Sequence, residues 1–211
     1  MKLYSIFFIN TILVFNVYSQ KNTEDKRLLF GLNYGQASQN KTPLNDQDYS
    51  YNNQYFKIQI NYLLLNKNKI SYELIIEPSL YLSEHQLLNK YFIQPHETPD
   101  YLSLREIFTQ KRAFNEYVLN IGIIMRYKII NNFSSYLLGS IGPMFSDEDT
   151  ERLRKGFAFS DIFGLGFSYE RKKVVFDLRL TVRHNSNADL YLPNGGHNSI
   201  GVESGISFRL R

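Results

Sequence analysis

The 211-residue sequence contains no cysteine and no tryptophan. Without cysteine the chain has no disulfide, no thiol nucleophile and no thiolate metal site. Beyond residue 17 it also lacks any run of about 18 apolar residues, the length that a membrane-spanning helix needs. The formal net charge of +4 is mild and does not indicate a nucleic-acid-binding protein. Aromatic residues, by contrast, are abundant, with 16 Tyr and 16 Phe, and they favour β-strands.

The first 19 residues have the pattern of a secretory signal peptide. Lys2 precedes an apolar stretch from Leu3 to about Val17, and small residues stand where a cleavage after Ser19 requires them. The alternative is a transmembrane anchor, but the stretch is short and two asparagines interrupt it. We therefore expect a signal peptide over residues 1–19 and a single exported domain over residues 20–211.

Eight later segments alternate apolar and polar residues with the period of two that β-strands have. They cover residues 28–35, 55–63, 71–82, 118–129, 134–145, 156–170, 173–184 and 199–211. A soluble barrel with its apolar face inward would show the same alternation. Many strands, however, are long enough to cross a bilayer when tilted, and glycine and serine share the polar face with charges of both signs. The pattern favours an all-β fold, an eight-stranded antiparallel transmembrane β-barrel of the outer-membrane type.

The lengths of the connections agree with this fold. Three are tight, at residues 66–68, 131–132 and 171–172, and they alternate with four long ones at about 36–53, 84–113, 146–155 and 188–197. Short turns at one end and long loops at the other are typical of bacterial outer-membrane barrels. The longest loop is expected to contain a short helix in "LSLREIFTQ".

A polar cluster is predicted where the seventh strand meets the fourth long loop. His184 and Ser186 share the parity of the lipid-facing residues of their strand, and Asn198 shares that of the eighth strand. Glu203 has the opposite parity and is expected to point into the lumen. Polar side chains on a lipid-facing wall indicate a functional site, although an interfacial polar girdle would place them in the same way.

Beyond these patterns, the stretch "RHNSNADLYLPNGG", with "GSIGPMF" and "TERLRKGFAFSDIFGLGFSYE" before it, resembles the lipid A 3-O-deacylases (PagL type) and their acyloxyacyl-hydrolase-like relatives. The resemblance covers about residues 115–211. It implies an outer-membrane esterase that removes the 3-O-acyl chain of lipid A in lipopolysaccharide, with no metal or other cofactor.

The resemblance also implies roles for individual residues. Ser186 would be the nucleophile, His184 the general base, and Asn187, with the backbone at Ala188 and Asp189, the oxyanion hole. Asn198 stands where the family carries a catalytic Glu; its amide oxygen can still orient the imidazole, but it supplies no negative charge. Basic residues of the loops are candidates for the lipid A phosphates: Lys111, Arg112, Arg152, Arg154 and Lys155.

Two other functions remain open at this stage. The chain could be a structural or adhesion barrel without catalysis. It could also be a barrel that kept the fold and lost activity, because Asn198 supplies no negative charge and because the Asp189 carboxylate, where a Gly is common in the family, would oppose the charge that develops on the oxyanion. The oligomeric state is not predicted.

Overall fold

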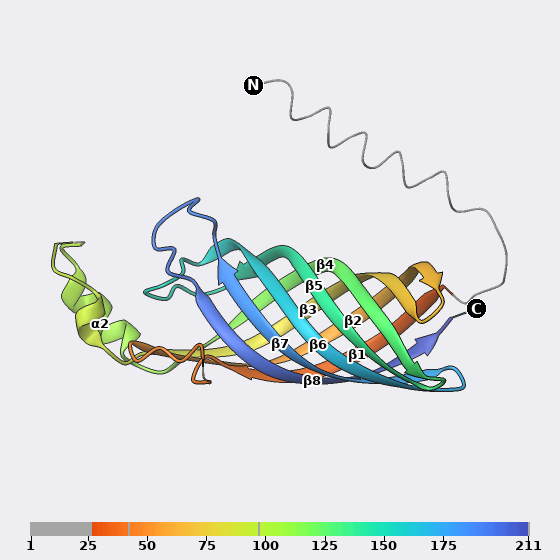
Figure 1. Ribbon diagram of the computed structural model, residues 1–211. Coiled ribbons are helices and arrows are strands. Elements are labelled where there is room, and N and C mark those ends of the chain that lie inside the picture. Colours follow the sequence, from red (N-terminus) through yellow and green to blue (C-terminus); the bar gives the residue numbers. More distant parts are fainter. Residues whose placement is uncertain (1–26, 42, 97, 211) are drawn as a thin grey trace, which may run out of the picture.

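The computed structural model describes residues 27–41, 43–96 and 98–210; the signal peptide expected over residues 1–19 lies outside them. These residues form eight antiparallel strands that close into a barrel in chain order (Figure 1). The strands are β1 (Leu28–Ser38), β2 (Tyr49–Lys67), β3 (Ile70–Leu87), β4 (Arg112–Ile130), β5 (Phe133–Ser146), β6 (Gly156–Arg171), β7 (Val174–Ser186) and β8 (His197–Arg209).

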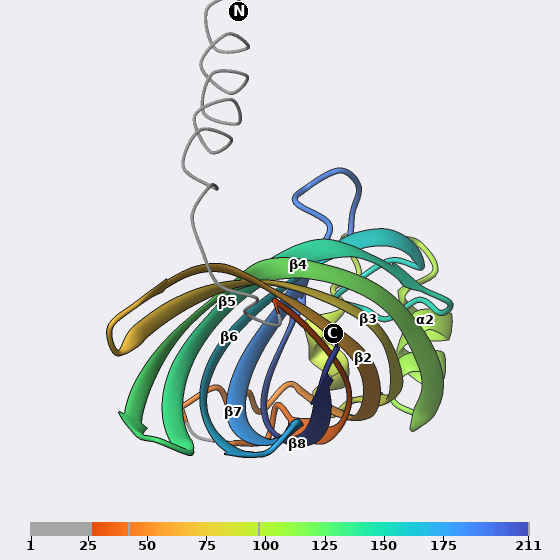
Figure 2. The same ribbon diagram turned by 90° about the vertical axis from the view of Figure 1, so that its right-hand side faces the viewer.

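The barrel closes because β1 pairs with both β2 and β8. Each strand therefore has a paired neighbour on either side, so that its backbone N–H and C=O groups can be hydrogen-bonded, the condition for strands in lipid. Figure 2 looks toward the end with the tight turns and shows the strands wrapping around the lumen. The prediction of an eight-stranded barrel is confirmed.

Long and tight connections lie at opposite ends of the barrel (Figure 1). Between β3 and β4 the chain forms the 3-10 helix η1 (Lys90–Phe92) and the helix α2 (Tyr101–Phe108), as expected for this loop. In the described ranges, no helix is long and apolar enough to cross a membrane. Two of the tight turns contain a residue in the left-handed region, Asn68 (φ 56°) and Lys172 (φ 60°), as two-residue hairpin turns require.

Three strands are longer than the sequence predicted. β2, β3 and β4 reach 19, 18 and 19 residues, because each continues toward the long loops beyond its apolar segment. There the outward residues are polar, among them Asn52, Glu84 and Asn115, so the apolar–polar alternation ends before the strand does.

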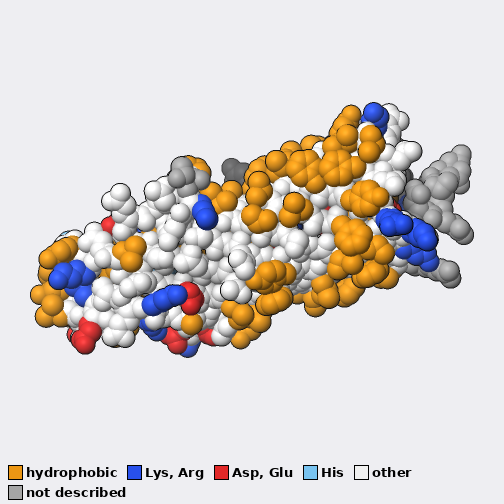
Figure 3. All heavy atoms as spheres, turned by 90° about the horizontal axis from the view of Figure 1, so that it is seen from below, with side chains coloured by type: hydrophobic (Ala, Val, Ile, Leu, Met, Phe, Trp, Pro, Cys, Tyr) orange, Lys and Arg blue, Asp and Glu red, His pale blue; other side chains and the backbone are white. Residues whose placement is uncertain are grey.

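The apolar face of the strands points outward. In β7, Leu178 and Leu180 are 54% and 56% exposed, whereas Asp177 and Arg179 between and beside them are buried. Figure 3 shows apolar side chains concentrated on the part of the barrel nearer the tight turns, while the surface toward α2 is more polar. This is the arrangement of a lipid-facing wall, and it contradicts the alternative of a soluble barrel with an apolar interior.

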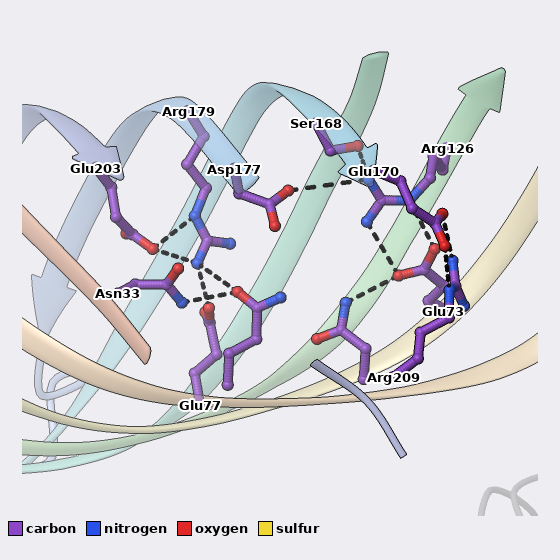
Figure 4. A network of polar contacts seen from close by, with 12 residues as sticks. Asn33, Glu73, Glu77, Arg126, Ser168, Glu170, Asp177, Arg179, Glu203 and Arg209 are labelled. Carbon is purple, nitrogen blue, oxygen red and sulfur yellow. Dashed lines mark hydrogen bonds and ion pairs between the residues drawn. The ribbon is translucent and has the colours of Figure 1, made fainter. Parts of the chain in front are cut away.

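Ionic and hydrogen-bonded networks fill the lumen (Figure 4). Arg179 binds Glu203 through Nε at 2.7 Å and contacts Glu77 through Nη2; Lys57 lies 2.9 Å from the second oxygen of Glu203. Nearer the tight turns, Arg126 donates to both oxygens of Glu73 at 2.7 and 3.1 Å. Because their charges are paired, these groups can be buried in a narrow lumen.

Glycines on the lumen side make room for aromatic rings. A Cβ added at Gly166 would lie 2.3 Å from the ring of Tyr136, and one at Gly35 would lie 2.3 Å from the ring of Tyr55. The small residues predicted on the polar face are therefore required where large side chains cross the barrel.

Candidate active site

The predicted cluster lies on the outer wall, where β7 ends and β8 begins. His184 and Asn198 are directly opposite each other in the β7–β8 ladder, and Ser186 follows two residues later on the same face of β7. All three side chains are half-buried, whereas Arg183 and Asn185 between them are buried in the lumen. Their placement follows from the alternation of β7 and from the register of β8.

His184 and Asn198 are joined by a hydrogen bond of 2.8 Å between Nδ1 and Oδ1. With the amide oxygen as acceptor, Nδ1 carries the proton and Nε2 keeps its lone pair. That tautomer is the one a general base needs when Nε2 faces a hydroxyl. Asn198 thus makes a contact that can orient the imidazole ring.

The Ser186 hydroxyl makes no hydrogen bond within the described chain. The structure therefore brings His184 and Asn198 into contact and places Ser186 beside them, without a formed Ser–His hydrogen bond. In enzymes without bound substrate such bonds are often long and tighten only in the complex.

The loop after Ser186 is held by Asn187 and Asn194. The Asn187 backbone N–H donates to Asn194 Oδ1 at 2.8 Å, and the Asn187 side chain donates to Tyr191 O at 2.7 Å. Asn194 Nδ2 in turn donates to Asp189 Oδ1 at 2.8 Å. The Asn187 side chain thus binds its own loop, and the Asp189 carboxylate is bound by an amide.

Two other oxyanion candidates have free donors. Ala188 (φ 53°) and Asp189 (φ 59°) both adopt the left-handed conformation directly after the predicted nucleophile. Within the described ranges, their backbone N–H groups have no acceptor. Consecutive free N–H groups in such a turn can form an anion-binding concavity.

Sequence reasoning did not single out Asn194, the residue that ties this loop together. Its signal is weak, an Asn before two glycines in "YLPNGG". A second loop also supports the turn: Arg152 donates from Nε to Gly196 O at 2.9 Å, and Leu153 forms an isolated bridge with Asn194. Loop 147–155 therefore braces the segment after Ser186.

Glu203 lies away from the cluster, as its parity predicted. It is 1% exposed and bound to Arg179 and Lys57 in the lumen. It cannot replace Asn198 as the partner of His184.

The five predicted basic residues differ in their contacts. Lys111 pairs with Glu84 at 2.6 Å, Arg112 pairs with Glu148, and Arg152 binds loop carbonyls. The exposed side chains of Arg154 and Lys155 form no ion pair within the described chain, and the Arg154 guanidinium lies 6.0 Å from the Tyr191 ring centroid. These two remain available for an anionic ligand beside the loop that follows Ser186.

An apolar groove of about 520 Å³ begins at His184 and runs along the outer wall. Its outward-facing lining includes Ile141, Phe163 and Val182, with Gly139 among them. A Cβ built on Gly139 would meet nothing within 4 Å, so the glycine leaves a hollow in the wall. The described residues contain no group of three or more His, Asp or Glu side chains placed to hold a metal ion.

Comparisons with known proteins agree with the barrel fold. The family model described as lipid A 3-O-deacylase (PagL) matches residues 106–207. The crystal structure of the outer membrane enzyme PagL superposes with a TM-score of 0.55 and 11% identity, covering 84% of this chain and 97% of that chain. At that identity the likeness shows the fold.

Two further solved barrels are more distant. The outer membrane protein OprG from Pseudomonas aeruginosa has a TM-score of 0.41 and 10% identity, covering 88% of this chain and 96% of its own. A de novo designed transmembrane β-barrel has a TM-score of 0.38 and 12% identity, covering 90% of this chain and 100% of its own. A search of curated protein sequences finds no match.

Proposed function

Since the chain is an outer-membrane β-barrel of the lipid A 3-O-deacylase (PagL) family, matched over residues 106–207, we propose that it is a serine esterase that removes the 3-O-acyl chain of lipid A. The observation that carries the proposal is the hydrogen-bonded His184–Asn198 pair on the lipid-facing wall, with Ser186 beside it and an apolar groove leading away from it. A lumenal site would be closed to a membrane lipid, whereas this one opens to the leaflet.

The proposed reaction proceeds through an acyl-enzyme. His184 Nε2 removes the proton of the Ser186 hydroxyl as Oγ attacks the ester carbonyl. The tetrahedral intermediate collapses when the C–O bond to the sugar breaks, and the imidazolium returns the proton to the leaving sugar oxygen. A water molecule, deprotonated by the same imidazole, then hydrolyses the acyl-enzyme and releases the fatty acid.

The developing oxyanion is assigned to the free backbone N–H groups of Ala188 and Asp189. One well-placed donor of this kind contributes about 3–4 kcal/mol to transition-state stabilisation. Asn187 and Asn194 hold the turn that presents these donors. The Asp189 carboxylate accepts a hydrogen bond from the amide of Asn194, which is a neutral partner.

The experiment is mass spectrometry of lipid A from cells that express wild type, Ser186→Ala or Ser204→Ala. Ser204 is an exposed serine on the outer wall of β8 and serves as the matched control. Loss of one acyl chain with wild type and Ser204→Ala, and intact lipid A with Ser186→Ala, supports the enzyme. Intact lipid A in all three strains, with each protein folded in the outer membrane, contradicts it and favours a structural or adhesion barrel.

A further inference from the structure

One carboxylate lies on the lipid-facing wall beside the candidate site. Asp161 occupies an outward position of β6, in a row whose neighbours Phe157, Phe163 and Leu165 are exposed aromatic or aliphatic side chains. The β6–β7 ladder places it directly opposite His184, and both residues line the apolar groove. Side chains directly opposite on antiparallel strands have Cβ atoms about 5 Å apart.

This carboxylate has no partner in the described chain. Its Oδ1 atom is enclosed and accepts no hydrogen bond, and no ion pair forms at either oxygen. Burying an ionised group without a partner is costly, and on a lipid-facing wall the cost is greater still. The lumen shows the contrast, because acidic groups such as Glu73 and Glu203 are paired there with arginine.

The candidate catalytic cluster lacks a negative charge, which Asp161 carries. When His184 takes the proton of Ser186 it becomes an imidazolium, and Asn198 meets it with a neutral amide oxygen. In a triad the acidic member both orients the ring and stabilises its positive charge. Here Asn198 provides only the first of these two effects.

Among the residues that the structure describes, no other carboxylate faces His184 so directly. β8 presents Asn198, the loop after Ser186 holds its Asp189 carboxylate on Asn194, and the neighbouring Arg183 points into the lumen. Asp161 approaches from β6, the side opposite to Asn198.

We propose that Asp161 is a positioning residue that supplies, from β6, the negative charge that Asn198 does not. The triad is thus divided between two strands: Asn198 fixes the tautomer and orientation of the ring, and Asp161 stabilises the imidazolium across a short gap of low dielectric constant. The inference rests on the proposed function of Ser186 and His184.

The test measures kcat and KM for lipid A in mixed micelles, together with the rate at which a small fluorophosphonate labels Ser186. Asp161→Asn removes the charge and keeps the shape. Asp161→Asn/Asn198→Asp restores one negative charge to the cluster from the β8 side. Glu106→Gln, which removes an exposed carboxylate of helix α2, is the control.

Asp161→Asn is expected to lower kcat and the labelling rate on the order of tenfold, with KM unchanged. The double variant is expected to recover to within about threefold of wild type, since one added charge can replace another if the effect is electrostatic. Glu106→Gln should match wild type. A purely structural role for Asp161 would not be rescued by a charge on β8.

The inference is overturned if Asp161→Asn behaves as wild type, or if the double variant stays as slow as the single one. The outcome for the proposed function is separate. If Ser186 is labelled but lipid A is unchanged, lipid A is not the substrate. The role of Asp161 is then still supported when the labelling rates of the variants follow the expected order. Failure of wild type to be labelled would overturn both.

Discussion

Replacement of Arg179 tests whether the lumenal network holds the barrel together. The side chain is 1% exposed and is the shared partner of Glu77 and Glu203. Within the described part of the chain, Lys57 is the only other cation paired with these two carboxylates. The four groups are balanced, two positive and two negative. Arg179→Met therefore leaves one uncompensated negative charge in the buried lumen.

Removing one partner of a buried ion pair costs about 3–5 kcal/mol, because the remaining charge stays desolvated. Arg179→Met/Glu77→Gln restores the balance between Lys57 and Glu203. The double variant is therefore expected to lose only about 1–2 kcal/mol, the order of magnitude for hydrogen bonds lost with both partners changed.

The free energy of unfolding is obtained from urea titrations of the barrel in lipid vesicles, extrapolated linearly to water. The expected order of stability is wild type, then the double variant, then Arg179→Met. The reasoning is refuted if Arg179→Met lies within about 1 kcal/mol of wild type, or if the double variant is as unstable as the single one.

Three further predictions concern the outer wall and its loops. Gly139→Phe fills the hollow of the groove, so hydrolysis of long-chain lipid A should fall about tenfold, while labelling by a small fluorophosphonate, measured in parallel, stays unchanged. Arg154→Ala/Lys155→Ala removes the two loop cations that form no ion pair within the described chain. The KM for lipid A should rise several-fold, whereas the KM for dephosphorylated lipid A should stay unchanged; both are measured by product release from mixed micelles. Asn194→Ala frees the Asn187 N–H and loosens the oxyanion turn, so kcat should drop about 10–100-fold in the same assay, with unchanged urea stability.

Strand parity could be predicted from the sequence because it depends only on alternation along one strand. It correctly placed Leu178 and His184 outward and Arg179 and Glu203 inward. The ends of β2 to β4 were missed, since beyond the apolar band polar residues such as Glu84 face outward, while aromatic residues such as Tyr51 and Phe114 face inward. Strand parity can be recognised only where outward residues face lipid and inward residues face the polar lumen. Beyond the membrane this contrast between apolar and polar positions is lost.

Contacts between strands were harder to predict because they depend on register. The sequence placed the turn between the sixth and seventh strands at residues 171–172, whereas the structure has it at 172–173. When the turn moves by one residue along the chain, the partner of every residue on the opposite strand changes by two positions. With the predicted turn His184 would face Phe159, and the carboxylate of Asp161 opposite the imidazole would be overlooked.

The hydrogen bonds of the loop after Ser186 were also beyond prediction. Nothing in the sequence indicates that the Asn187 side chain turns back to Tyr191 O instead of facing a substrate. Such contacts depend on the backbone angles of Ala188 and Asp189, which short-range patterns do not determine. The assignments of Ser186, His184 and Asn198 as catalytic residues stay predictions.

The sideways opening of the candidate site changes what substrate concentration means for the proposed esterase. A cleft that opens to water samples the bulk solution, but the pair formed by His184 and Asn198 samples the leaflet around the barrel. For an enzyme built in this way, the rate follows the mole fraction of substrate among the neighbouring lipids. Adding inert lipid slows it, whereas diluting the same vesicles in buffer leaves each barrel with an unchanged supply.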